Sequence, residues 1–159
     1  GGASVGFNKA FASFGLSEKV LRLGTLIEEN TLAGIGIGNA KNLYSSSGYF
    51  ANITTPAAKA FAQAYSKKFG PQAPILNGLG QSTYEGFLML EAIAHKAGSL
   101  SVAKMEAARE GVTYSSPRGS VTIKSRHVEQ DVYVADVDAN GFRVVKTFSR
   151  VSSGQTCKA

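Results

Sequence analysis

Two neighbouring carboxylates, Glu28 and Glu29, are the side chains of this sequence that most suggest a binding role. They directly follow the apolar segment 20–27 (VLRLGTLI), whose length and β-branched end are typical of a buried strand. Ligands of open α/β sheets gather at the carboxyl ends of the strands. A carboxylate there can hold an ammonium group or accept amide N–H bonds, each contributing about 1.5–3 kcal/mol. We expect one of the two to face a cleft, the alternative being a solvated pair in a loop.

Two further segments suggest contacts with a small molecule. The glycine-rich opening leads into a helix, and Ala3 and Ser4 lie at its start, where free N–H groups suit a carboxylate or another acceptor. Tyr49 and Phe50 form a short extended aromatic segment in front of a capped helix. Packing in the core is the default interpretation of this aromatic pair, and lining a ligand cleft is the alternative.

The residues of common catalytic and metal sites do not form a recognisable pattern. The two histidines, His95 and His127, lie on different expected elements, and the single cysteine, Cys157, lacks the neighbours of a zinc cluster. No GxSxG, HExxH or P-loop motif occurs. The glycines of segment 34–38 lack the helix and the distant acidic residue of a dinucleotide site, which favours a flexible loop. The sequence therefore predicts no enzyme, no metal and no cofactor.

Composition narrows the class of protein further. The 159 residues are 43% apolar and 18% charged, which is ordinary for a globular domain. No apolar stretch approaches the roughly 20 residues of a transmembrane helix. Seventeen basic and eleven acidic residues give a net charge of +6, but the basic residues are scattered and no nucleic-acid-binding motif accompanies them. We expect a solvated surface, without a nucleic-acid partner and without a membrane span.

The order of expected elements indicates an α/β fold. An opening helix reaches Phe14 and ends at Gly15, and segment 20–27 then forms a strand. Thr55 caps a helix that begins at Pro56 and stops at Gly70. Two more helices are expected, 82–97, which is apolar on most sides and so should be well buried, and 102–109.

The last part of the chain is rich in β-formers. Strands are expected at 120–123, 131–137 and 142–148, with His127 in a polar turn between two of them. Asn140 and Gly141 are a strong tight-turn signal, so the last two strands should form an antiparallel hairpin. After Phe148 the sequence becomes polar, and we expect it to fray.

Taken together, five segments resemble, in order, the C-terminal part of a type I periplasmic solute-binding protein of an ABC transporter. The nearest kin by this resemblance are the binders of amides, urea and branched-chain amino acids. The segments are GGASVGFNKAF, LIEENTLAGIG, GYFANITTPAAKAFAQAYSKKFG, STYEGFLMLEAIAHKAGS and YSSPRGSVTIKSRHVEQDVYVADVDANGFRVV.

The resemblance implies two lobes joined by crossing segments, with a solute bound between them. By this resemblance Ala3, Ser4, Glu28, Glu29 and Tyr49 would face the cleft between the lobes. Residues 1–53 would belong to the C-terminal lobe, 54–118 to the N-terminal lobe and 119–159 to the C-terminal lobe again, with crossings near 49–53 and 115–121.

The resemblance also implies a chain that begins inside the second lobe, as a fragment of a longer protein would. The first residue is not an initiator methionine, and no signal peptide is visible. Such a fragment would expose apolar surface and would self-associate or swap segments with a second copy. Cys157 would be free to pair with a cysteine of the absent part.

The implied function is the periplasmic solute-binding component of an ABC importer, which captures a small polar solute and delivers it to the permease and ATPase. The solute would be an amino acid, an amide or a urea-like molecule, although the positive net charge also suits an anionic aromatic acid. The alternative is a cytoplasmic ligand sensor of the same fold that regulates transcription through a partner protein.

Overall fold

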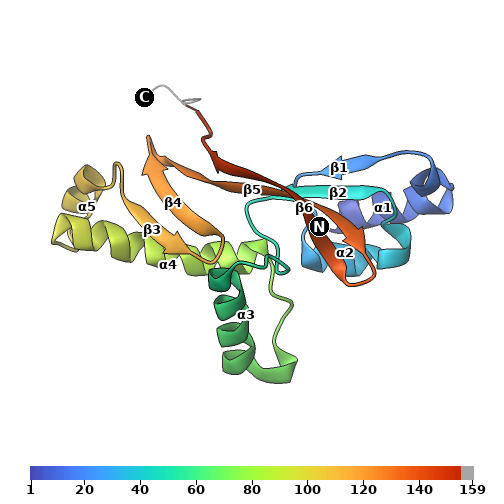
Figure 1. Ribbon diagram of the computed structural model, residues 1–159, viewed down its shortest axis with the longest axis horizontal. Helices are drawn as coiled ribbons and strands as arrows, with labels where there is room; N and C mark the ends of the chain where they lie inside the picture. The colour runs from blue at the N-terminus through green and yellow to red at the C-terminus, as the bar shows by residue number, and fades with distance from the viewer. Residues whose placement is uncertain (155–159) are drawn as a thin grey trace.

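The computed structural model describes residues 1–154. Its two groups of strands are connected by one long strand. This strand, β5 (His127–Asp138), runs through the middle of the molecule (Figure 1). Its first residues pair antiparallel with β4 (Gly119–Lys124), which pairs in turn with β3 (Thr113–Ser116). The beginning of β5 therefore belongs to one group of strands, and the rest of it reaches a second group.

The second group of strands lies along the later residues of β5. There β5 pairs antiparallel with β2 (Leu43–Ser47), which pairs in parallel with β1 (Arg22–Gly24). The last strand, β6 (Gly141–Val151), forms an antiparallel hairpin with β5. The strand order is β1-β2-β5-β4-β3, with β6 attached to β5.

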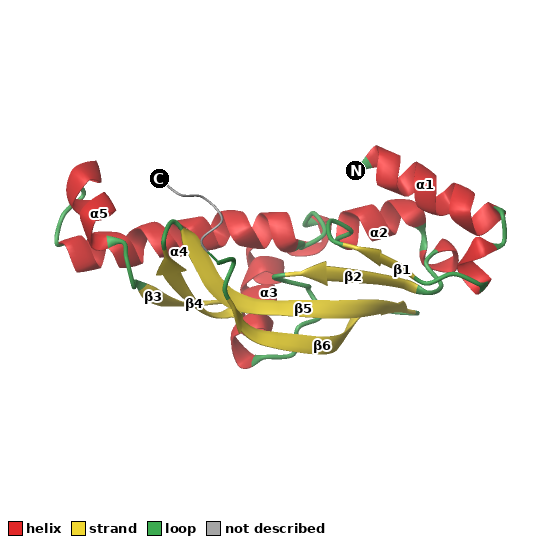
Figure 2. Cartoon of the chain, turned by 90° about the horizontal axis from the view of Figure 1, so that it is seen from above, coloured by secondary structure: helices red, strands yellow, loops and turns green. Residues whose placement is uncertain are grey.

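Helices follow one another along one side of these strands (Figure 2). They are α1 (Gly2–Ser13), α2 (Glu29–Ile35), α4 (Gly78–Ala97) and α5 (Val102–Ala108), while α3 (Pro56–Phe69) projects away from the sheet (Figure 1). Three single 3-10 turns lie at Leu16–Glu18, Ile37–Asn39 and Gly70–Gln72.

Two separate hydrophobic clusters match the two groups of strands. The larger cluster centres on Phe50, which is fully buried, with its ring centroid 4.9 Å from that of Phe142. The smaller cluster contains Ile93 of α4, Val112 and Ile123 of β4. Thus β4 packs with α4, and only β5 continues from one cluster into the other.

The α/β class, the capped helix and the C-terminal hairpin are confirmed. The Thr55 hydroxyl accepts a hydrogen bond from the amide of Ala58 at 3.2 Å, and α3 ends at Phe69, just before Gly70. The hairpin forms as expected, but its two-residue turn is Ala139 and Asn140, one residue earlier than the signal suggested, and Gly141 begins β6 opposite Asp138. Local capping and turn signals therefore predicted where α3 begins and ends and that the last two strands form a hairpin.

Several expected boundaries are wrong. The opening helix starts at Gly2, with Gly1 as its N-cap, so the opening glycines do not form a separate turn. Segment 20–27 forms only a three-residue strand, because the chain bends after Gly24. Segment 33–39 is not a loop, since α2 and a 3-10 turn occupy most of it. Strand β6 continues past Phe148 to Val151, held by pairing with β5, and His127 begins β5 instead of lying in a turn.

The expectation that the helix at 82–97 is well buried is also wrong. Its side chains at Tyr84, Phe87 and Leu90 are 47%, 70% and 49% exposed. Tyr84 and Phe87 are exposed because they line, together with Phe61, an open apolar hollow of about 1130 Å³ between α3 and α4, whereas Leu90 lies outside this lining. Another side of α4 packs on β3 and β4.

Candidate functional site

Glu28 is the N-cap of α2. One carboxylate oxygen accepts the amide of Thr31 at 2.9 Å and its hydroxyl at 2.6 Å, and the other accepts the amide of Asn30 at 2.9 Å. Burial alone would raise the pKa of Glu28, but these hydrogen bonds outweigh it and hold the pKa below its usual range. Glu28 is therefore an ionised carboxylate that stabilises the start of a helix and still has unused lone pairs.

Glu29, the first residue of α2, is held differently. Its Oε1 accepts the backbone amide of Ala51 at 2.7 Å, whereas its Oε2 is buried and has no partner among the described residues. Burial raises the pKa of Glu29, and the neighbouring charge of Glu28 adds to this, while the amide of Ala51 opposes it. Both carboxylate oxygens of Glu28 accept hydrogen bonds, whereas Glu29 has one oxygen without a partner among the described residues.

Tyr49 lies in the larger hydrophobic cluster and is 1% exposed. Its ring contacts Phe61 of α3 edge-on, with centroids 6.3 Å apart, and its buried hydroxyl has no partner among the described residues. Burial raises the pKa of Tyr49 to about 12, with a smaller contribution from the charge of Glu29. Tyr49 therefore packs as a core residue. Its hydroxyl, which has no partner among the described residues, lies near enough to Glu29 for the carboxylate charge to raise its pKa.

Ala3 and Ser4 lie on the first turn of α1 and line a hollow of about 560 Å³ with the end of β1. Ile27, the residue before Glu28, belongs to the same lining. Glu28, Glu29 and Tyr49 do not line this hollow. The structure thus places Ala3 and Ser4 beside the end of β1, and Glu29 and Tyr49 beside the segment that follows β2.

Sequence reasoning missed Arg22, a residue of β1 that joins α1 to the loop before β2. Its guanidinium donates to Asn8 Oδ1 at 2.6 Å and to the carbonyl of Lys41 at 2.7 Å, and it lies 4.5 Å from the ring centroid of Phe11. These contacts fix α1 against β1. An arginine in a short apolar strand was the only local signal, and it could not identify partners on α1 and in the loop before β2.

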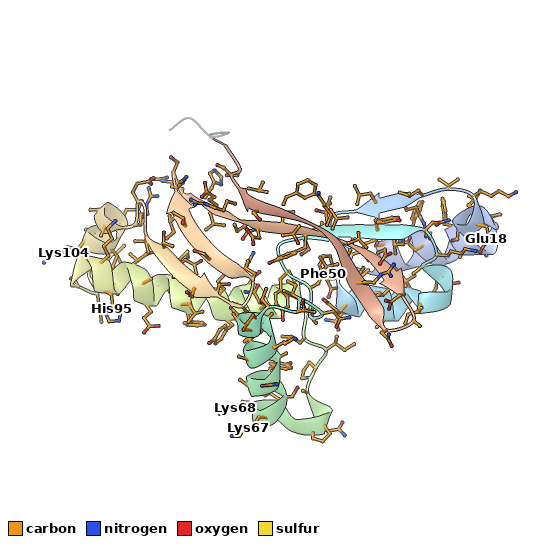
Figure 3. All side chains as sticks on the ribbon, viewed as in Figure 1. Glu18, Phe50, Lys67, Lys68, His95 and Lys104 are labelled. Atoms are coloured by element: carbon orange, nitrogen blue, oxygen red, sulfur yellow. The ribbon has the colours of Figure 1, made fainter. Side chains whose placement is uncertain are left out.

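The charged side chains of the surface are spread over the ends of the molecule (Figure 3). Lys67 and Lys68 lie at the end of α3, Lys104 lies on α5, and Glu18 lies at the opposite end (Figure 3). Within residues 1–154, no group of three histidine, cysteine or acidic side chains is placed to hold a metal ion. In the same range no helix combines the length and apolar character of a membrane span. Cys157 lies outside the described residues.

Residues 1–142 match the family described as periplasmic binding protein. The chain belongs to this family. A relative in Brucella melitensis biotype 1, Leu/Ile/Val-binding protein homolog 6, is 29% identical over 143 residues, which cover 86% of this chain and 36% of the relative. A limonene hydroxylase of Geobacillus stearothermophilus is 31% identical over 109 residues, or 67% of this chain and 20% of the relative.

The fold of this family member is the type I periplasmic-binding-protein fold. A solute-binding protein of an ABC transporter from Rhodopseudomonas palustris HaA2, solved in complex with p-hydroxybenzoic acid, superimposes with a TM-score of 0.84 at 27% identity. That comparison covers 100% of this chain and 45% of the other. The chain therefore spans about a third of the Brucella relative and less than half of the solved binding protein.

Proposed function

We propose that this chain is part of a periplasmic solute-binding protein that captures a small polar solute and delivers it to an ABC permease and ATPase. The observation that carries the proposal is the pair of carboxylates at the start of α2, where Glu29 keeps one buried oxygen without a partner. Membership of the periplasmic binding protein family supports the same function. A protein that only binds a solute needs acceptor atoms that match the donors of the solute, and a hinge that lets two lobes close around it. It needs no catalytic residue.

The two-lobed division of the chain remains part of the proposal. Residues 1–53 would belong to the C-terminal lobe and 54–118 to the N-terminal lobe. The pairing of β4 with β3, and the packing of Ile123 against Ile93, favour keeping β4 with the N-terminal lobe. We therefore place the return to the C-terminal lobe at the irregularity in β5 between Gln130 and Val132, and not at residue 119.

The chemistry of Glu28 and Glu29 favours a solute that brings a hydrogen-bond donor. An amino-acid ammonium or an amide N–H would meet the free oxygen of Glu29, and so would a phenolic hydroxyl such as that of p-hydroxybenzoic acid. Benzoate carries the same carboxylate charge as 4-hydroxybenzoate but offers no donor, so the phenolic hydroxyl alone distinguishes the two. Amino acids, amides and hydroxylated aromatic acids are therefore the proposed solutes. Tyr49 would contribute through its buried hydroxyl near Glu29, and Ala3 and Ser4 through the separate hollow that they line.

Titration calorimetry on the full-length gene product tests the role of the carboxylates, with L-leucine and 4-hydroxybenzoate as probes. Glu28→Gln and Glu29→Gln keep the shape of the side chain and remove its charge. Losing one charged partner should weaken binding of the accepted probe by about 1–3 kcal/mol, or roughly 5- to 150-fold. Unchanged affinity in both variants would exclude the proposed site.

The apolar hollow between α3 and α4 supports a second part of the proposal. Monomeric proteins rarely expose large contiguous apolar patches, and Phe69, Leu79 and Phe87 are all more than half exposed there. We propose that this 159-residue chain, produced alone, covers the hollow by self-association or segment swapping. Sedimentation at several concentrations should show a dimer or larger species, and a monomer throughout would contradict this part.

A further inference from the structure

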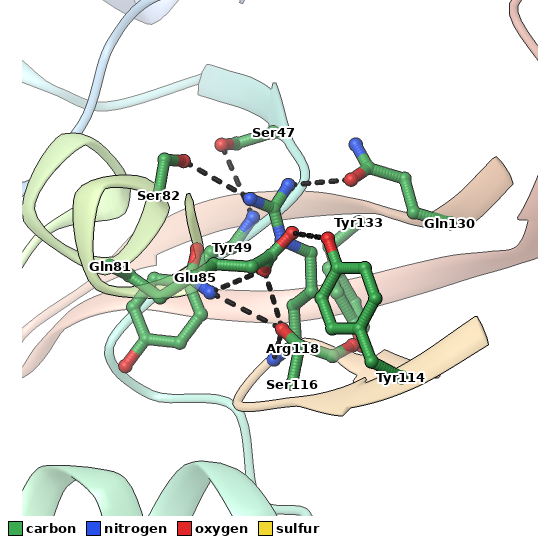
Figure 4. A network of polar contacts seen from close by, with 10 residues as sticks. All are labelled: Ser47, Tyr49, Gln81, Ser82, Glu85, Tyr114, Ser116, Arg118, Gln130 and Tyr133. Carbon is green, nitrogen blue, oxygen red and sulfur yellow. Dashed lines mark hydrogen bonds and ion pairs between the residues drawn. The ribbon is translucent and has the colours of Figure 1, made fainter. Parts of the chain in front are cut away.

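The side chain of Arg118 lies where the two groups of strands meet. Arg118 is in the turn between β3 and β4, and its side chain is only 10% exposed. Its Nε donates to Glu85 Oε2 at 2.6 Å, and its Nη2 donates to Ser82 Oγ at 3.1 Å (Figure 4). Both partners are on α4, so the guanidinium attaches the β3–β4 turn to the long helix.

Glu85, the partner of Arg118, is a buried carboxylate with four donors. Besides Arg118 these are Gln81 Nε2 at 2.7 Å, Ser116 Oγ at 2.5 Å and Tyr114 OH at 3.1 Å (Figure 4). A buried ion pair is tolerable only when further hydrogen bonds satisfy its remaining atoms. Here they do, so the pair has one well-defined geometry, which gives the guanidinium a fixed position.

The same arginine also contacts β5, at the point where this strand passes from one group of strands to the other. Its Nη1 donates to Gln130 Oε1 at 2.6 Å, and its backbone carbonyl accepts the hydroxyl of Tyr133 at 2.8 Å. Gln130 lies at the irregularity in the β5–β6 pairing, and Tyr133 belongs to the larger hydrophobic cluster. Arg118 therefore bonds to residues on both sides of this passage.

Gly48 brings the other crossing segment to the same guanidinium. It directly follows β2, and a Cβ added there would lie 2.6 Å from Arg118 Nη1 and 2.8 Å from Gln130 Nε2. Its φ lies outside the left-handed region, so an alanine would add a methyl group without backbone strain. The methyl group could fit only if the Arg118–Gln130 contact moved.

We propose that Arg118 is the joint between the two groups of strands: it fastens α4 and the β3–β4 turn to β5 at Gln130, and its guanidinium lies against Gly48 of the other crossing segment. These hydrogen bonds hold α4 and the β3–β4 turn in one orientation relative to β5, so a change in that orientation has to break them. Describing such a change as lobe closure around a solute rests on the proposed function. The fastening by Arg118 does not depend on the proposed function, and its test uses no solute. A failed test of the fastening would therefore leave the solute-binding proposal intact, and the reverse also holds.

Hydrogen exchange measured by mass spectrometry on the intact chain tests the joint, with Gly48→Ala as the main variant. The methyl group displaces the guanidinium, so exchange in peptides covering 116–119 and 130–133 should become at least tenfold faster. Exchange in α2 should change by less than twofold. The matched control is Gly86→Ala on α4, where an added Cβ meets no atom within 4 Å and both peptides should be unaffected.

The same substitution at Gly48, made in a variant that lacks the Arg118 guanidinium, distinguishes loss of the Arg118 contacts from simple crowding at Gly48. Arg118→Met alone would leave the Glu85 charge unpaired, so Glu85→Gln/Arg118→Met is used, which removes both charges together. Adding Gly48→Ala to that background should accelerate exchange at 130–133 clearly less than it does in the wild-type chain, because only the 2.8 Å approach to Gln130 Nε2 remains. The proposal is overturned if Gly48→Ala leaves wild-type exchange unchanged, or if it accelerates exchange equally without the guanidinium.

Discussion

Glu29 and Ala51 are joined by a hydrogen bond of 2.7 Å from the backbone amide to the carboxylate, although 22 residues separate them. The contact connects the start of α2 to the segment that follows β2, which belongs to the second group of strands. Glu29 therefore lies beside the larger hydrophobic cluster, to which Tyr49, Phe50 and Ile53 of that segment belong. A solute that met its second oxygen would bind beside the segment that we propose as a crossing between the lobes.

Replacing Glu29 should change the pH dependence of stability in a defined direction. The pKa of Glu29 is raised in the folded protein, so the folded state binds the proton of this carboxyl more tightly than the unfolded state does. The contribution of Glu29 to stability is therefore fully present below about pH 4.3 and is lost as the pH rises through the raised pKa. Glu29→Gln should therefore be more stable relative to wild type at pH 7 than at pH 4. Guanidinium chloride unfolding at both values measures this, and an equal difference at both would contradict it.

Glu28→Gln should show the opposite sign. The folded-state pKa of Glu28 is lowered, so its stabilising effect is fully present above the unfolded value and is lost as pH falls through the folded one. At pH 7 the variant loses the helix cap, and unfolding should become easier by about 1 kcal/mol. The deficit should shrink at acidic pH. A deficit that grew on acidification would show that the carboxylate does not cap α2.

Thr55→Ala should weaken α3 by removing the hydroxyl that accepts the amide of Ala58. An N-cap of this kind contributes about 1 kcal/mol, which corresponds to a fall in melting temperature of about 2–4 °C for a chain of this length. Thermal unfolding followed by circular dichroism measures the shift. Thr55→Ser, which keeps the hydroxyl, is the matched control and should melt close to wild type; equal losses in both variants would argue against the cap.

Phe50→Ala should be far more damaging than the same change at the surface. Phe50 is fully buried against Phe142, and such truncations cost about 3–5 kcal/mol. Phe148 is 49% exposed, and Phe148→Ala should cost well under half as much. Chemical unfolding of the two variants compares them directly. Similar losses would mean that the larger cluster is not centred on Phe50.

The elements that the sequence could predict are those with complete local signals. Thr55, Pro56 and Gly70 mark both ends of α3, and Asn140 with Gly141 marks the turn of the hairpin. Helix α2 was missed because Gly34 and Gly36 suggested a loop, and because glutamate is a weaker capping signal than serine or aspartate. Strand β2 was missed because its serines have low strand propensity, and its pairing with β1 and β5 enforces the conformation.

The candidate site was predictable only in part. The position of Glu28 and Glu29 after a short strand was visible in the sequence, and so was the aromatic character of Tyr49. Their different environments were not, because the amide of Ala51 and the ring of Phe61 come from other parts of the chain. The Glu85–Arg118 pair spans 33 residues and carries no local pattern at all.

Capture of a donor-bearing solute is tested most directly by the melting temperature of the full-length gene product in the presence of candidate solutes. The panel is L-leucine, L-valine, acetamide, urea and 4-hydroxybenzoate, with benzoate as the control that lacks a donor. A solute present at 100 times its Kd stabilises by about 2.7 kcal/mol, so at least one panel member should raise the melting temperature of a product more than twice this length by about 3 °C, and benzoate should not. No shift with any of the five, or a shift with benzoate alone, would contradict the account.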